Sequence, residues 1–291
     1  MLTRSLTIIA AGGSTTVQDL GRSGRAHLGV PPSGAADRGA FALANRLVGN
    51  VIGAAVIEMT MGALAFTANA EVFVVVTGAP AQVHRDGTPM GHCAGFAVPA
   101  GSSITVDPPT SGVRSYLAVR GGIGVQPVLG SRSTDTLSGL GPPAVTAGVV
   151  LPIGDDAGAW PAVTVAPPTP PPALHAPVSL RCEPGPRADA LLDPAALTAG
   201  RWLVAAASDR IGVRLDPAPG STVPRLRPGS DTVASEGIAL GSVQMPPGGQ
   251  PVIFLADHPV TGGYPVVAVL TARSLDLAAQ LRPGTEVRLH T

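Results

Sequence analysis

Short apolar or alternating stretches follow one another along the chain, separated by turns that contain glycine and proline. Turn signals such as Arg85-Asp-Gly87 and Pro99-Ala-Gly101 recur roughly every ten residues, a spacing typical of an antiparallel barrel or sandwich. Strands are expected at 3–10, 64–67, 72–77, 82–85, 96–98, 104–106 and 114–119, and again at 178–182, 201–206, 242–245, 252–256, 266–270 and 286–290. The stretch 54–61 fits a strand or a short helix equally well. The pattern therefore predicts a mainly β chain.

Apolar residues at helical spacing occur at one clear place in the first half. Asp37 is a good N-cap and Gly49 a good terminator, and Phe41, Ala44, Leu47 and Val48 fall at helical spacing between them. In the second half a helix is expected at about 188–192. Another is expected from Ser274, as the N-cap, to about 281, because Pro283-Gly284 follows. A few short helices therefore accompany the strands.

The composition changes between Gly154 and Ala176, where two aspartates precede a Pro-Pro-Thr-Pro-Pro-Pro run. Such a run favours an extended chain and lacks the backbone N–H groups that a sheet needs. We therefore expect a first lobe at 1–154, a Pro-rich linker at 155–177 and a second lobe at 178–291. The alternative is a long surface loop within one lobe.

Composition excludes several classes of function. Charged residues make up 13% of the chain and the formal net charge is zero, so no electrostatic footprint for nucleic acid is present. All 19 basic residues are arginine, which excludes a Schiff-base lysine and a phosphate-loop lysine. Cys93 and Cys182 lie far apart and none of the 6 histidines has metal-ligand spacing, so neither a disulfide framework nor a metal site is expected.

A signal peptide, or an apolar run long enough to span a membrane, would indicate the compartment of the protein. Residues 1–11 do not show the usual pattern of a signal peptide. Apolar runs such as 72–76 have the length of a strand and fall far short of a membrane span. A cytoplasmic protein without membrane contact is expected.

Polar residues are concentrated in one glycine- and proline-rich stretch of the first half, at 17–46. Such a loop suits a ligand-binding surface, and the alternative is a merely polar surface loop. His27 lies in it and has either a functional or a structural role. The candidate binding residues here are Gln18, Asp19, Arg22, Ser33, Asp37 and Asn45.

This stretch and four later motifs, in the same order, resemble the family of 5-oxoprolinase C subunits. The family is also called allophanate hydrolase subunit 2 or KipA-like, and it includes the A/B region of the carboxyltransferase part of urea carboxylase. The later motifs are Tyr116-Leu-Ala-Val-Arg-Gly-Gly-Ile123 with Gly130-Ser-Arg-Ser-Thr134, then Ser208-Asp-Arg-Ile-Gly-Val-Arg-Leu215, Ser235-Glu-Gly237 through Pro251, and Asp257 through Thr261-Gly-Gly-Tyr-Pro265. The resemblance implies two cyclophilin-like β-barrel lobes with a few short helices, in agreement with the strand pattern.

The motif residues supply the candidate chemistry. Arg132 and Ser133 sit in a turn that resembles an anion-binding nest, and Arg22, Arg114, Arg120 and Arg210 lie beside other motif turns. Each arginine could instead tie a loop to a carboxylate. Further binding candidates are Ser208, Asp209, Arg210, Thr261, Gly262 and Gly263, where Asp209 and Arg210 read as an acid–base pair or as a structural one. The catalytic candidates are Asp19, Glu236, Gln244, Asp257 and Tyr264.

The family's activity follows as an implication of the resemblance. It implies a C component of an ATP-dependent 5-oxoprolinase, a hydrolase of C–N amide bonds that opens pyroglutamate to glutamate and is active only in a complex. The partners would be a subunit-B-like protein (KipI-like, or allophanate hydrolase subunit 1) and an A component of the LamB/YcsF type, with ATP at a junction between components. One alternative is a biotin-dependent carboxyltransferase acting on urea or a related amide, with biotin supplied in trans. Another is a KipA-like, non-enzymatic regulator of a kinase inhibitor.

Two departures from the family pattern bear on the substrate. Ile211-Gly-Val213 stands where the family often has Met-Gly-Tyr. His258-Pro259-Val260 replaces a polar run before Thr261. The second change removes hydrogen-bonding groups, which points to a different substrate or a weaker activity.

Overall fold

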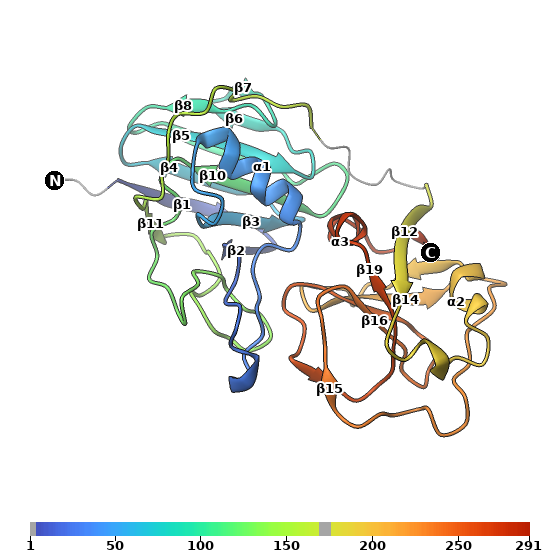
Figure 1. The fold of residues 1–291 in the computed structure, drawn as a ribbon. Helices are drawn as coiled ribbons and strands as arrows, with labels where there is room; N and C mark the ends of the chain where they lie inside the picture. The colour runs from blue at the N-terminus through green and yellow to red at the C-terminus, as the bar shows by residue number, and fades with distance from the viewer. Residues whose placement is uncertain (1–3, 169–175) are drawn as a thin grey trace. The chain divides into compact units, whose positions relative to one another are not determined.

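The computed structural model describes residues 4–168 and 176–291, and its contacts divide these residues into two compact units. The first unit holds residues 4–22, 33–135 and 139–168. The second holds 176–291 together with two loops of the first half, at 23–32 and 136–138. Figure 1 shows the strand-rich build of each unit, with short helices among the strands.

Two antiparallel sheets make up most of the first unit. One has the strand order β11-β1-β4-β9-β6-β7 and the other the order β2-β3-β10-β5-β8. The bounds in the first sheet are β11 Val150–Pro152, β1 Ser5–Ala11, β4 Leu64–Ala68, β9 Ser103–Val106, β6 Val83–Arg85 and β7 Thr88–Met90. Those in the second are β2 Ser14–Gln18, β3 Val56–Thr60, β10 Arg114–Val119, β5 Val72–Gly78 and β8 Phe96–Val98.

The second sheet of this unit is buried on both faces. Leu117 and Val119 of β10 join a core that also contains Leu6 and Phe66 of the first sheet. The residues that alternate with them in β10 form another core with helix α1 (Arg38–Val48), which contributes Phe41, Ala44, Leu47 and Val48. Because side chains of a strand alternate between faces, β10 is buried along its whole length.

A closed barrel of seven strands forms the second unit, in the order β12-β19-β16-β17-β14-β13-β20. Trp202, Leu215, Val243 and Leu289 are among the side chains that fill its core. The strands are β12 Val178–Pro184, β13 Trp202–Val204, β14 Gly212–Pro217, β16 Ser242–Gln244, β17 Val252–Phe254, β19 Val266–Leu270 and β20 Glu286–His290. A ribbon of β15 (Glu236–Gly237) and β18 (Thr261–Gly262), the helices α2 (Ala195–Ala199) and α3 (Ala272–Ala278), and the 3-10 turns η1 (Ala26–Leu28) and η2 (Ala188–Ala190) complete the unit.

The mainly β fold with short helices is confirmed. Asp37 caps α1 by accepting a hydrogen bond from the Ala40 N–H at 2.9 Å, and Gly49 ends it with φ of +68°. The Asp86-Gly87 hairpin turn has positive φ at both residues, as a type I′ turn requires. The ambiguous stretch 54–61 contains the strand β3, because both of its neighbours in the sheet, β2 and β10, are strands with which it pairs.

Other local predictions were wrong. Residues 188–190 form a 3-10 turn rather than an α-helix. The N-cap of α3 is Thr271, not Ser274, because the Thr271 hydroxyl accepts the Ser274 N–H; the helix ends at Ala278. The strands β2 and β14 were not predicted, since Ser14–Gln18 is largely polar and Gly212–Pro217 begins beside a glycine-containing turn.

The predicted linker at 155–177 differs in extent from what the contacts show. Asp156 donates its N–H to Gly121 O at 3.0 Å, and Ala166 donates to Cys93 O at 3.0 Å, so residues 155–166 pack on the first unit. Asp156 and Ala166 can donate these hydrogen bonds because both precede the Pro-rich run, whose prolines lack a backbone N–H. Residues 169–175 of the predicted linker lie outside the described residues.

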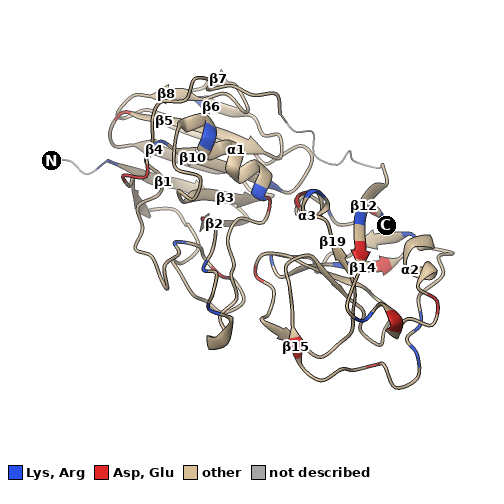
Figure 2. Ribbon diagram, viewed as in Figure 1, with Lys and Arg blue, Asp and Glu red and all other residues tan. Residues whose placement is uncertain are grey.

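Charged side chains occupy only short stretches of the ribbon (Figure 2), in keeping with their 13% share of the chain. Among the described residues, no helix is both long and apolar enough to cross a membrane.

Candidate functional site

The predicted anion nest at Gly130–Thr134 holds a carboxylate of the chain itself. Asp19 accepts hydrogen bonds from the hydroxyls of Ser131 and Ser133 and from the N–H of Arg132, each at 2.6 Å, and from the Gly21 N–H at 2.7 Å. Asp19 is 7% exposed. With these four donors on its two oxygens, the carboxylate ties the loop after β2 to the turn at 130–134. This geometry is that of a structural anion rather than of a free catalytic base.

Gln18 and Arg22 lie next to this tie and each keeps one polar atom without a partner. The Gln18 amide donates to Thr134 O at 2.9 Å, while its Oε1 is buried and unpartnered. The Arg22 guanidinium donates to Ser133 O, and its Nη1 is buried and unpartnered. Both residues are almost completely buried. Both side chains therefore brace the loop.

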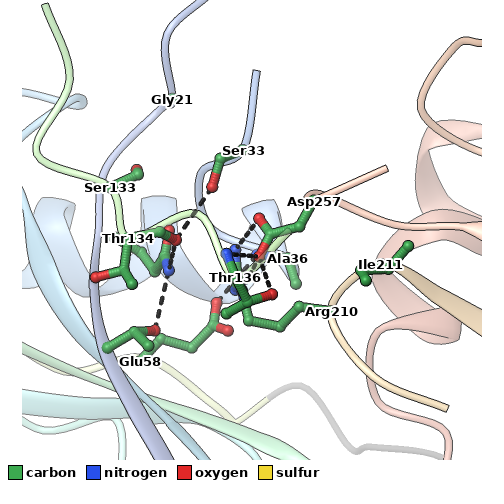
Figure 3. Close-up of polar contacts among 12 residues, drawn as sticks. Gly21, Ser33, Ala36, Glu58, Ser133, Thr134, Thr136, Arg210, Ile211 and Asp257 are labelled. Atoms are coloured by element: carbon green, nitrogen blue, oxygen red, sulfur yellow. Dashed lines mark hydrogen bonds and ion pairs between the residues drawn. The ribbon is translucent and has the colours of Figure 1, made fainter. Parts of the chain in front are cut away.

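A buried network centred on Glu58 holds the start of α1. One oxygen of Glu58 accepts the Ala36 N–H at 3.0 Å (Figure 3). The same oxygen accepts the Tyr116 hydroxyl at 2.8 Å, and that hydroxyl accepts the Asp37 N–H at 2.8 Å. Burial, and then the Glu58 charge, raise the pKa of Tyr116 well above its usual value. The Ser33 hydroxyl donates to Thr134 O at 3.2 Å, the same carbonyl that accepts the Gln18 amide (Figure 3).

Glu58 and Tyr116 were not predicted from the sequence as members of such a network. The available signal was a glutamate in the middle of the apolar run Val56-Ile-Glu-Met59, since an isolated charge in a buried strand needs partners. Arg114 supplies one such partner, with its Nε 3.6 Å from Glu58. Asn45, a predicted binding residue, instead donates to Ala54 O at 2.8 Å and stabilises the loop that follows α1.

Arg210 and Asp257 form a buried bidentate ion pair in the second unit. The Arg210 Nε and Nη2 each lie 2.9 Å from a different oxygen of Asp257, and the two side chains are 3% and 0% exposed (Figure 3). Asp257 also accepts the Thr136 N–H at 2.9 Å and the Thr136 hydroxyl at 2.6 Å. Burial by itself raises the pKa of the Asp257 carboxyl. Arg210 and Thr136 together lower that pKa by more than burial raises it, so the net shift is downward.

The Ser208-Asp-Arg210 motif is a capped turn in which Arg210 makes its bidentate pair with Asp257. Asp209 accepts the N–H groups of Ile211 at 2.8 Å and Gly212 at 3.1 Å, and Ser208 accepts the Arg214 N–H at 3.1 Å. Asp209 and Ser208 therefore shape the turn that aims Arg210 at Asp257.

The remaining candidates of the second half gather around the β15–β18 ribbon. Glu236 pairs with Gly262 in that ribbon and forms an ion pair with Arg187 at 2.9 Å. The Gln244 amide donates to Tyr264 O at 3.0 Å, and a Cβ at Gly262 would lie 2.7 Å from the same nitrogen. Tyr264 is 40% exposed. The Gln244 amide is thus fixed against the backbone carbonyl of Tyr264, whose side chain is exposed.

A pocket of about 340 Å³ lies between the second unit's loops. His27, on the 3-10 turn η1 that contributes to the wall, is exposed. The lining residues are Ala26, Gly29, Pro31, Leu137, Ser138, Pro259, Val260 and Thr261. In the first unit the structure brings together the predicted site residues Gln18, Asp19, Arg22, Ser33, Arg132 and Ser133. In the second unit they form two groups, Arg210 with Asp257, and Glu236 and Gln244 with Thr261–Tyr264.

No group of three or more His, Cys, Asp or Glu side chains suited to a metal ion occurs in the part of the chain that the structure describes.

Comparisons with known proteins identify relatives over nearly the whole chain. The C subunit of 5-oxoprolinase from Escherichia coli is 34% identical over 97% of this chain and 89% of its own length. The urea amidolyase of Saccharomyces cerevisiae is 31% identical over 98% of this chain, which spans 16% of that protein.

Two solved structures share the fold. TTHA0988 superposes with a TM-score of 0.84 at 34% identity, covering all of this chain and 56% of that one. The urea amidolyase of K. lactis superposes with a TM-score of 0.88 at 27% identity, covering 99% of this chain and 18% of that one. The family model for the carboxyltransferase domain, subdomain A and B, matches residues 28–291, and the chain belongs to this family.

Proposed function

We propose that this chain is the C component of an ATP-dependent 5-oxoprolinase, which opens the lactam of 5-oxoproline to give glutamate. The observation that carries the proposal is the match to the C subunit of the Escherichia coli 5-oxoprolinase at 34% identity, over 97% of this chain and 89% of the relative. A relative of similar length argues for a similar component of a larger enzyme. The chain would act together with a subunit-B-like protein and an A component of the LamB/YcsF type.

Lactam opening requires a donor to the amide oxygen and an activated water. The Tyr264 hydroxyl is the donor we assign, because 40% of this residue is exposed and a ligand can reach its phenol group. Gln244 fixes that segment through Tyr264 O. Asp257 is assigned a positioning role, since Arg210 and Thr136 engage both of its oxygens.

ATP would supply activation of the lactam oxygen by phosphorylation. The nest at Gly130–Thr134 does not fit a nucleotide phosphate, because the hydroxyls of Ser131 and Ser133 and the N–H of Arg132 already serve Asp19. We therefore assign no phosphate contact to this turn, and propose that ATP binds at a junction with a partner protein.

The second candidate is a biotin-dependent carboxyltransferase acting on urea or a related amide. The match of the carboxyltransferase A/B family model to residues 28–291 favours it, as does 32% identity to the urea amidolyase of Lachancea kluyveri over 97% of this chain. Because the chain contains no lysine, biotin would have to be carried by another protein.

Co-expression with a subunit-B-like protein, followed by size-exclusion chromatography and a glutamate assay with 5-oxoproline and ATP, tests the proposal. Co-elution and ATP-dependent glutamate formation are expected. Tyr264→Phe should lower kcat by about 100-fold without dissociating the complex, because one donor to the developing oxyanion is lost. Thr198→Ala, which removes a hydroxyl from helix α2, is the matched control and should leave kcat unchanged. Separate elution of the two proteins, or equal effects of the two substitutions, would contradict the proposal.

A further inference from the structure

The pocket of about 340 Å³ in the second unit has walls from three segments that are distant in sequence. One segment is the turn that includes Ala26, Gly29 and Pro31. The others are the pair Leu137–Ser138 and the stretch 259–261. The volume falls within the range of roughly 300–1,000 Å³ typical of small-molecule sites, and a water molecule occupies only about 30 Å³.

Two of the three walls adjoin residues whose contacts fix the backbone. Leu137 follows Thr136, which is bound to Asp257 through both its N–H and its hydroxyl. Pro259 follows His258, whose side chain is 3% exposed and whose Nδ1 lies 2.8 Å from Pro259 O. The backbone at Val260 is fixed further, because its carbonyl accepts the Ile238 N–H at 2.9 Å. The pocket is therefore preformed, which lowers the entropic cost of binding.

The chemistry of the lining is apolar with two hydroxyls. Pro31, Leu137, Pro259 and Val260 supply apolar surface, and Ser138 and Thr261 supply the hydroxyls. Among the described residues that line the pocket, none is charged. Leu137 leaves 44% of its surface exposed, an apolar area that a ligand could cover.

This lining disfavours an anionic group. The guanidinium of Arg210 points two of its nitrogens at Asp257, so its charge is already neutralised. A carboxylate entering the pocket would lose hydration without gaining a cation, which is costly. An amide carbonyl or N–H could instead pair with the hydroxyls while an alkyl or ring portion contacts the apolar walls.

We propose that this pocket binds the uncharged, apolar end of an amide or lactam, so that the chain accepts substrates with an apolar substituent in addition to 5-oxoproline. This rests on the proposed function as an enzyme component that acts on amides or lactams. Pro259, Val260 and Leu137 are then the residues that determine specificity.

Titration of the full chain with a ladder of neutral probes tests the proposal. The probes are 2-pyrrolidinone and its 5-methyl, 5-ethyl and 5-propyl derivatives, with 5-oxoproline as the charged member of the same size class. Each added methylene should tighten binding by about fourfold, and 5-oxoproline should bind no better than 2-pyrrolidinone. Equal affinity along the ladder, or tightest binding by 5-oxoproline, would overturn the proposal.

Two variants place the probes in this pocket. Val260→Asp should lower the affinity for the propyl probe at least about tenfold. Leu137→Ala, at a more exposed position with less risk to folding, should reduce the gain in affinity for each added methylene. Val223→Asp is the control, since it places the same charge at an exposed valine of the other pocket in this unit. An unchanged ladder in folded Val260→Asp and Leu137→Ala would overturn the pocket assignment.

The glutamate assay on the complex separates the two proposals. In one outcome, Val260→Asp weakens the binding of the alkyl-substituted probes, but the wild-type complex forms no glutamate. That result would refute the 5-oxoprolinase function and leave the ligand-binding role of the pocket standing. Glutamate formation by the complex, with equal affinity of the chain for all the neutral probes, would refute the proposed role of the pocket and leave the 5-oxoprolinase function standing.

Discussion

The ion pair of Arg210 and Asp257 offers the sharpest prediction of stability. The side chains are 3% and 0% exposed and meet through two hydrogen bonds of 2.9 Å. Removing one partner leaves a buried charge uncompensated, which costs about 3–5 kcal/mol. Arg210→Met and Asp257→Leu should therefore each lower the free energy of unfolding of the second unit by about that amount.

The double variant should lose much less free energy of unfolding than the two single variants lose together. Replacing both members of a buried pair by apolar residues of similar volume is often neutral or stabilising. We expect Arg210→Met/Asp257→Leu to lie within about 2 kcal/mol of the parent, the remaining loss being that of the acceptor for Thr136. The coupling energy of the cycle should then be about 4 kcal/mol or more.

Urea unfolding followed by the fluorescence of Trp202 measures this effect. Trp202 is fully buried in the core of the second unit, and a Trp160→Phe background removes the signal of the first unit. The exposed pair of Arg187 and Glu236, also joined at 2.9 Å, is the control, and its Arg187→Met variant should barely move the midpoint. Additive single substitutions, with a coupling energy below about 1 kcal/mol, would refute the reasoning.

Three further results are expected. Because the pKa of Asp257 is lowered in the folded state, its contribution is complete above the unfolded pKa of about 3.9 and is lost as the pH falls through the folded value; the urea midpoint should therefore drop below about pH 4 in the parent and less so in Asp257→Asn. Tyr116→Phe removes a donor to buried Glu58 and should cost about 1–3 kcal/mol in urea unfolding followed by circular dichroism, whereas a cost near zero would contradict the network. Burial raises the pKa of Cys93 to about 11 and also raises that of Cys182, so Ellman's reagent at pH 8 should label the thiols in denaturant but not in the native chain; rapid native labelling would contradict their burial.

Local pattern was sufficient for most of the fold. The range of β10 was predicted correctly because six consecutive residues of that strand are buried and most of them are apolar or small. The cap residues Asp37 and Gly49 likewise bounded α1. Errors arose where a partner outside the segment decides the structure: β2 is largely polar and becomes a strand because β3 pairs with it at five positions, Ser14 to Gln18.

The site was less predictable because its contacts join residues far apart in sequence. Asp19 reads as a free polar residue of a loop, yet its donors Ser131 and Ser133 lie 112 and 114 positions away. Asp209 seemed the natural partner of Arg210, but Asp257, 47 positions later, takes that place. Sequence spacing identifies which residue types gather at turns, whereas the pairing among them depends on the tertiary fold.

Conversion of carbon-13-labelled 5-oxoproline by the co-purified complex, followed by NMR, decides whether the complex is a 5-oxoprolinase. The account predicts that labelled glutamate accumulates only when ATP is present, and that bicarbonate and a biotin carrier change nothing. Transfer of the labelled carboxyl group from carbon-13 carboxybiotin on a carrier protein to a nitrogen of urea, with 5-oxoproline left intact, would contradict the 5-oxoprolinase function and assign the chain to carboxyl transfer.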